Sequence, residues 1–279
     1  MVRARLLPAR GRRLEPIRRN PILFKAESVP KATPRARRRR HGHPDPAYRR
    51  GSSTAHRAGS VPAAAVMNDL PLFPLNTVLF PSGVLPLRVF EARYMDMVRD
   101  CLRDGTRFGV CLIARGNEVA RKPGEAAVPE DVGCIAEILA WDMRDLGVLH
   151  IRTVGRERFR VLHSRVQANG LVRADVEMIA ADAPAPVATE HRECVALLAR
   201  LIAELEEKRD NADEPPEPGA LDTFPFHEPY ALHEAGWVAN RLCEVLPVPL
   251  KAKQKLMELE SGHERLAIVD TYLRQQKVL

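Results

Sequence analysis

Apolar and polar residues alternate with a period of about two between residues 70 and 179. This period is typical of β-strands, because successive side chains of a strand point to opposite faces of the sheet. Turn residues, mainly Gly, Pro, Asn and Asp, separate the alternating stretches. Gly155 is expected to break one long stretch into two. The pattern predicts six or so short strands, at 70–75, 84–89, 107–113, 132–143, 148–154, 158–162 and 171–179.

One stretch near the start of this region has a helical period instead, and it predicts a helix over residues 90–102. Its expected apolar stripe consists of Phe90, Tyr94, Met97, Val98 and Cys101. Short strands with one helix inserted early predict a small, partly closed β-barrel. In the strand 158–162, Phe159 and Val161 alternate with Arg158 and Arg160, which predicts a buried face and a solvent-facing one.

The apolar period changes to 3.6 after residue 186 and predicts a bundle of helices. Thr189 is expected to cap the first helix, and Pro229 to lie in the first turn of the second. Pro249 opens a third helix, and the capping box formed by Ser261 and Glu264 opens the last. The predicted class is therefore α+β. A β-barrel subdomain with an inserted helix covers residues 67–182, and an α-helical bundle subdomain covers residues 187–279.

Charge is distributed unevenly along the 279 residues. Residues 1–66 contain 17 Lys and Arg but three acids, a net charge of +14, whereas the remainder has a net charge of −7. We expect the basic segment to be disordered, because it has few apolar residues to bury. Three interpretations stay open: an over-extended gene model with the true start at Met67, a basic tail that touches nucleic acid or anionic surfaces, or an organelle-targeting peptide.

The five cysteines form no CxxC pair, and each lies in a periodic apolar stretch. This predicts small buried side chains in a reducing compartment, so we expect a cytoplasmic protein. No stretch approaches the roughly 18 consecutive apolar residues of a membrane span, and we expect no membrane partner. The histidines do not cluster with acids or cysteines, so no metal site is predicted. The cysteines are Cys101, Cys111, Cys134, Cys194 and Cys243.

Three stretches resemble the N-terminal, substrate-binding domain of Lon proteases: 70–94 (LPLFPLNTVLFPSGVLPLRVFEARY), 147–161 (GVLHIRTVGRERFRV), and 246–259 (LPVPLKAKQKLMEL) followed by Glu264-Arg-Leu266. The resemblance extends over nearly all of residues 67–279. It implies a PUA-like β-barrel followed by a helical subdomain. It also implies a role in engaging unfolded or damaged polypeptides, with a separate protease or chaperone as a further partner.

The sequence contains no GxxxxGK[ST] phosphate-binding loop and no counterpart of the Ser–Lys dyad of Lon proteases. We therefore expect a non-catalytic protein without a cofactor. Exposed apolar side chains would bind hydrophobic segments of client polypeptides. The turn at Phe80 and Pro81 is the first candidate for such exposure, and Phe224 with Phe226 is the second. The complete set of candidate peptide-binding residues is Phe73, Phe80, Pro81, Arg88, Phe90, Glu91, Arg93, Tyr94, Phe224 and Phe226.

Each candidate also has a structural interpretation. The aromatic residues are large enough to fill a small barrel, and Glu91 with Arg93 can form an ion pair that anchors the helix to the barrel. Arg88, at a strand end, is equally ambiguous. A second functional hypothesis is RNA binding, against which stand the net charge of −7 and the scarcity of aromatic residues. It rests on Arg152, Arg156, Arg158, Arg160 and Arg165. A small-ligand site or a cryptic enzymatic role in the cleft between the subdomains stays open as a third.

Overall fold

The computed structural model describes residues 65–118, 126–143, 146–211, 221–222 and 224–279. The expectations for the basic segment concern residues that lie, except for the last two, outside the described part of the chain. Within that part the expected α+β class is confirmed. The strands are β1 (Val66–Leu75), β2 (Val84–Val89), β3 (Phe108–Arg115), β4 (Val128–Asp142), β5 (Leu149–Val166) and β6 (Val172–Met178). The helices are α1 (Ala92–Asp104), α2 (Arg192–Asp210), α3 (Ala235–Val245), α4 (Leu250–Glu258) and α5 (Gly262–Gln275).

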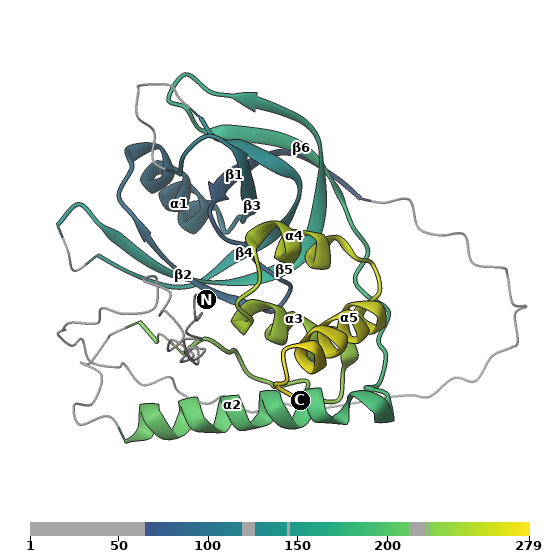
Figure 1. Cartoon of the computed structure of the whole chain (residues 1–279). Helices are drawn as coiled ribbons and strands as arrows, with labels where there is room; N and C mark the ends of the chain where they lie inside the picture. The colour runs from purple at the N-terminus through teal and green to yellow at the C-terminus, as the bar shows by residue number, and fades with distance from the viewer. Residues whose placement is uncertain (1–64, 119–125, 144–145, 212–220, 223) are drawn as a thin grey trace, which may run out of the picture.

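The six strands form one sheet in the order β2-β5-β4-β3-β1-β6, and an additional pairing of β5 with β6 closes it. All pairs are antiparallel except β1 with β3. The long strand β5 makes the closure possible: its first half pairs with β2 and its second half with β6. As a result β2, the start of β5 and the end of β4 form a three-stranded extension beyond the closed part (Figure 1).

Gly155 does not break this strand, contrary to the sequence-based expectation. The strand continues through it, because the missing side chain leaves room for another segment of backbone. A Cβ at this position would lie 2.1 Å from the carbonyl oxygen of Phe80. Gly155 donates to the carbonyl of Gly83 at 2.8 Å and accepts from the amide of Ser82 at 2.8 Å. The glycine therefore marks a close backbone approach, a known use of glycine inside strands.

The helix α1 starts later than its apolar pattern predicts. Its N-cap is Glu91, and it ends at Gly105, whose φ of 64° is left-handed and whose amide bonds to the carbonyl of Cys101. Phe90 consequently lies before the helix and is 55% exposed, so its assignment to the apolar stripe was wrong. The other four members of the stripe are buried: Tyr94, Met97, Val98 and Cys101.

Two of the four predicted starts in the helical region are correct. Pro249 is the N-cap of α4. The Ser261 hydroxyl accepts from the amide of Glu264 at 3.2 Å and caps α5. Thr189 instead lies in a short 3-10 turn before α2 and makes no side-chain cap, because the α-helix begins three residues later. Residues around Pro229 are irregular, and α3 starts only at Ala235.

The largest apolar core lies between the sheet and the helices α2 to α5. Val78, Phe80, Leu112 and Val132 enter it from the β-region, and residues of all four helices enter from the other side. A second core fills the closed sheet beneath α1, with Phe73, Phe108 and Ile151 among its residues. In Figure 1 the helices α3, α4 and α5 lie between the sheet and α2, whereas α1 lies on another side of the sheet.

Candidate functional site

Two aromatic candidates are core residues of the closed sheet. The rings of Phe73 and Tyr94 stack with their centroids 4.0 Å apart, and Phe108 lies 6.1 Å from Phe73. Phe73 is 6% exposed and Tyr94 is 3% exposed. Burial also raises the pKa of the Tyr94 hydroxyl to about 12. Both side chains therefore fill the core of the closed sheet in this conformation.

The turn at Phe80 and Pro81 is not the exposed apolar site that the sequence suggested. Phe80 is 0% exposed and lies in the core shared with the helices. The reason is the close contact of its backbone with Gly155, which fixes the turn against β5. The carbonyl of Pro81 accepts a hydrogen bond of 2.9 Å from the buried guanidinium of Arg241 in α3. The turn joins the sheet to the helices.

The second expectation of exposure, at Phe224 and Phe226, is also wrong. The two side chains are 6% and 3% exposed, with ring centroids 5.9 Å apart. Arg152 of β5 holds their backbone, because its guanidinium donates to the Phe224 carbonyl at 3.2 Å and forms an ion pair with Asp222 at 3.1 Å. The segment is thus fixed on the sheet, and its aromatic rings complete the larger core.

Glu91 and Arg93 form an ion pair, with 2.9 Å between the carboxylate and the guanidinium. Arg93 is 6% exposed and also donates to the carbonyl of Gly170, in the turn between β5 and β6, at 2.9 Å. Its guanidinium lies 4.6 Å from the centroid of the Tyr94 ring. The interpretation of this pair as an anchor of α1 to the sheet is confirmed.

The two remaining candidates lie at the end of the three-stranded extension. Arg88 is exposed and pairs across β2 and β5 with His150, and Phe90 follows directly after β2. On the far strand, Trp141 is opposite Ile151 and is 55% exposed. Figure 1 shows the β4–β5 hairpin extending to the left, past the closed part of the sheet.

Sequence reasoning named only Phe90 among four exposed apolar side chains at this end. We name this group the hairpin-end surface: Phe90, Trp141, Met143 and Leu146, which are 55%, 55%, 50% and 103% exposed. Trp141 faces the same side as Ile151, which is 1% exposed, because directly opposite residues of antiparallel strands share a face. The core face therefore continues into solvent here. The sequence did carry a signal of this exposure, since Trp141, Met143 and Leu146 lie in or next to the turn near Asp145-Leu-Gly147.

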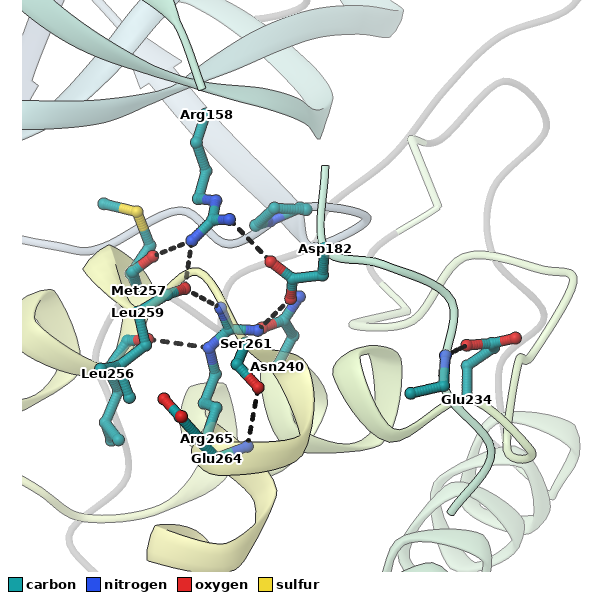
Figure 2. Close-up of polar contacts among 12 residues, drawn as sticks. Arg158, Asp182, Glu234, Asn240, Leu256, Met257, Leu259, Ser261, Glu264 and Arg265 are labelled. Carbon is teal, nitrogen blue, oxygen red and sulfur yellow. Dashed lines mark hydrogen bonds and ion pairs between the residues drawn. The ribbon is translucent and has the colours of Figure 1, made fainter. Parts of the chain in front are cut away.

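A buried network of charged residues fixes the helices against the sheet (Figure 2). The Asp182 carboxylate lies 2.6 Å from the guanidinium of Arg158 in β5 and 2.7 Å from that of Arg265 in α5. Both arginines are 2% exposed, and Arg265 also donates to the side-chain oxygen of Asn240 in α3 at 2.9 Å. The prediction that Arg158 faces solvent is wrong, because the helices cover this part of β5.

Backbone carbonyls at the end of α4 accept hydrogen bonds from the guanidinium groups of both Arg158 and Arg265. Arg158 donates to the carbonyls of Met257, at 2.9 Å, and Leu259, whereas Arg265 donates to those of Leu256, at 2.8 Å, and Leu259. These carbonyls have no partner within the helix, and the C-terminal end of a helix favours positive charge. One carboxylate and several carbonyls thus accommodate two buried cations. The arrangement is architectural and offers no reacting group.

A buried cysteine in the helical region lies beside an acid and a histidine. The Cys194 thiol is 3.2 Å from the Asp270 carboxylate, which is 3.5 Å from Nδ1 of His191. Burial raises the pKa of Cys194 to about 12, so the thiolate that a nucleophile requires is absent near neutral pH. All five cysteines are free and buried, as predicted. In the described residues no group of side chains could hold a metal ion.

An open hollow of about 660 Å³ lies between the start of β1 and the end of α1. Asp69 at its edge already forms ion pairs with Arg165 and, at 2.8 Å, with Arg173. Asp104, on the other side, pairs with Arg103 at 2.8 Å. The charged groups that could bind a small ligand here are thus engaged with one another. Over the described residues, no helix has the length and apolar character needed to cross a membrane.

Several known proteins are similar to this chain. Cereblon of Danio rerio is 30% identical over 117 residues, which cover 40% of this chain and 26% of cereblon. The Lon protease of Anaeromyxobacter dehalogenans is 27% identical over 209 residues, which cover 75% of this chain and 23% of the protease. The chain thus spans about a quarter of the length of these curated relatives.

A solved structure and a family model agree on a single domain type. The crystal structure of a Lon N-terminal domain protein from Xanthomonas campestris is 34% identical, with a TM-score of 0.56, and the match covers 73% of this chain and 97% of that one. The model of the ATP-dependent protease La (LON) substrate-binding domain matches residues 69–275. This protein therefore belongs to the family of Lon substrate-binding domains.

Proposed function

We propose that this protein binds unfolded or partly folded polypeptides by their exposed hydrophobic segments, and that it does so at the hairpin-end surface. The observation that carries this proposal is Trp141, an apolar side chain that continues the core face of the sheet and yet is 55% exposed. Exposed apolar side chains that gather in one region of a folded protein are candidates for an interaction site. Membership of a substrate-binding family supports the same function.

The chemistry of the surface fits a weak and promiscuous binder. Burial of apolar area contributes about 25 cal/mol per Å², and the loss of rigid-body and side-chain freedom offsets much of it. Four apolar side chains can therefore support an affinity in roughly the micromolar range. Arg88 is exposed at the same end but shares its face with His150 rather than with Trp141. It would therefore contact polar groups of the bound chain only where that chain passes the end of the sheet. The barrel beneath, PUA-like in our interpretation, would serve as the rigid support.

The other candidate residues have supporting roles in this proposal. Glu91 and Arg93 hold α1 and with it the position of Phe90. The cores on which the surface rests contain Phe73, Tyr94, Phe80, Phe224 and Phe226. Pro81 contributes through its carbonyl, which accepts from Arg241. The bound polypeptide would undergo no chemistry here. A separate protease or chaperone in the cytoplasm would receive it.

RNA binding is not supported by a specific observation. Arg152 and Arg158 are 7% and 2% exposed and are engaged inside the protein. Arg156 pairs with Glu137 at 3.0 Å. Arg165 pairs with Asp69, so Arg160, which is exposed, is the one arginine of the five that has no acidic partner among the described residues. The basic segment 1–66 keeps its own capacity for nucleic acid.

The test is a fluorescence-anisotropy titration of the full chain against a labelled, permanently unfolded polypeptide and a labelled structured RNA at two salt concentrations. We expect saturable binding of the polypeptide that changes little with salt, because apolar burial drives it. Serine at both Trp141 and Met143 should weaken it about tenfold or more. Ile268→Ser is the matched control, because Ile268 is 49% exposed on α5. Equal affinity of all three proteins for the polypeptide would refute the assignment.

A further inference from the structure

The strand β4 has an open edge next to the hairpin-end surface. Its pairing with β3 ends at Phe108 and Ala136, whereas its pairing with β5 continues to Asp142. Among the described residues, no backbone hydrogen bond joins residues 137–141 to any segment except β5. Burial changes at the same point, from fully buried residues over 132–136 to half-buried or exposed ones over 137–141.

Proline and unpaired charge, two common protections of an edge strand, are missing from the middle of this one. Edge strands are normally blunted by prolines or by charged side chains. The other edge of the extension, β2, contains Pro86 in its middle and Arg88 near its end. The β4 edge reads Ile138-Leu-Ala-Trp141, without a proline or a charge. The neighbouring Glu137 is already held by Arg107 at 2.7 Å and by Arg156 at 3.0 Å.

A bulge bends this edge, which limits the length of a straight added strand, and it also brings two apolar side chains to one face. The register of β4 against β5 shifts between Ile138 and Ala140. Ile138 is opposite Thr153 and Trp141 is opposite Ile151, so Ile138 and Trp141 share the core face although they are three residues apart. A strand added at this edge would meet both side chains on one face. Its own apolar residues would have to alternate to match them.

The size of the edge indicates what kind of partner fits. Five residues of strand span about 17 Å, and outside the bulge alternate residues present their amides and carbonyls outward. A stable dimer needs about 1,200 Å² of buried area, or roughly 20 to 30 residues on each side. The open edge is far too short for that. A single extended segment of another polypeptide needs no more than this edge and the apolar side chains beside it.

We propose that clients bind by strand addition: an extended segment with alternating apolar residues pairs through its backbone with residues 137–141 of β4 and places its apolar side chains against Trp141. This inference rests on the proposed function and specifies its geometry. Main-chain hydrogen bonds supply sequence-independent affinity in such a mode, and the apolar face selects the segment. The mode explains how one site can serve many unfolded chains.

The test uses the full chain and a short fluorescent peptide of alternating valine and threonine flanked by lysines. Two further copies carry N-methyl groups on the amides of the valines or on those of the threonines. Because the valines have to face Trp141, only one of these sets of amides points toward β4. One methylated copy should lose about tenfold or more in affinity, and the other should stay within about threefold of the parent peptide. Hydrogen exchange of the amides over 137–141 should slow when the parent peptide binds.

Equal effects of the two methylated copies, or no binding of the parent peptide, would overturn strand addition. So would unchanged hydrogen exchange over 137–141 at saturating peptide. If the serine variants of Trp141 and Met143 still weaken binding of the unfolded polypeptide in that case, the proposed function stands and only its geometry fails. A different outcome is protection of the amides over 137–141 from hydrogen exchange in the absence of peptide, to a degree that increases with protein concentration. That result would identify a second copy of the chain as the occupant of the edge, and it would also overturn the proposal.

Discussion

Arg158 and Asp182 lie 2.6 Å apart at the place where the sheet meets the helices. Arg158 belongs to β5, and Asp182 lies in the segment that leads from β6 to the helical region. The same carboxylate holds Arg265 of α5 at 2.7 Å (Figure 2). One acid therefore joins three segments that are far apart in the sequence. The position of the helices on the sheet depends on it.

Asp182→Asn should destabilise the protein strongly. The substitution leaves two buried guanidinium groups without their carboxylate, a loss that typically costs about 3–5 kcal/mol. Urea unfolding followed by circular dichroism measures the effect. Asp96→Asn is the matched control, because Asp96 pairs with Arg99 at 2.8 Å with side chains 60% and 66% exposed. The control should lose less than about 1 kcal/mol. Equal losses in the two variants would contradict the assigned role of Asp182.

Gly155→Ala tests the contact between β5 and the turn at Phe80. A Cβ would lie 2.1 Å from the Phe80 carbonyl oxygen, so the turn would have to move and disturb the shared core. We expect a loss of about 1–3 kcal/mol or more in the free energy of unfolding. Gly147→Ala is the comparison, because its φ of 80° strains an L side chain, unlike that of Gly155, but no atom would lie within 4 Å of the added Cβ. It should cost only about 1 kcal/mol, the backbone term.

The stability contributed by Glu137 should depend on pH. Hydrogen bonds from Arg156 hold the pKa of this carboxyl below its ordinary value of 4.5. A carboxyl whose pKa is lower in the folded than in the unfolded state stabilises the folded protein at pH values above the unfolded-state pKa. This contribution disappears as the pH falls through the folded-state pKa. Glu137→Gln should therefore cost up to about 1 kcal/mol at pH 7, a modest value because the pair is partly exposed.

The measurement is urea unfolding of the two proteins between pH 2 and pH 7. The stability difference between wild type and Glu137→Gln should shrink as the pH drops below about 4.5. A difference that stays constant over this range would show that the carboxylate charge is not what Glu137 contributes.

The cysteines should be inert in the folded protein. Burial raises the pKa of all five thiols, to about 12 for Cys194 and Cys243. Iodoacetamide at pH 7.5 should leave the native chain unmodified over minutes, and it should label all five cysteines in denaturant. Mass spectrometry counts the modified thiols. Fast modification of any cysteine in the native protein would contradict the assigned burial.

Local patterns in the sequence predicted the elements but not the contacts between them. β2 lies where its alternation placed it, and Ser261 caps α5 as its spacing with Glu264 indicated. Gly155 was misjudged because its role depends on Phe80, which is 75 residues away in the sequence. Arg158 was misjudged for a similar reason: its strand alternates correctly, but the helices cover the face that alternation assigns to solvent.

The candidate site was predicted only in part. Aromatic residues were sensible candidates, yet exposure depends on what packs against them, and the sequence gives no direct measure of that. Phe80 and Phe224 are covered by helices that follow them at a distance, whereas Phe90 is exposed because α1 starts two residues later. Trp141 was placed in the strand 132–143 and was not among the candidate residues. Its exposure follows from the start of β3 at Phe108, opposite Ala136, because β3 does not extend alongside the end of β4; no local pattern around Trp141 reveals this.

The most direct test of the central claim uses Trp141 as its own probe. The chain contains two tryptophans, so Trp237→Phe leaves Trp141 as the single one. Titration of this variant with an unfolded polypeptide that lacks tryptophan should shift the emission of Trp141 to the blue and reduce its quenching by acrylamide. Both changes should saturate with the affinity that anisotropy gives. Saturable binding that leaves the emission and quenching of Trp141 unchanged would contradict the account.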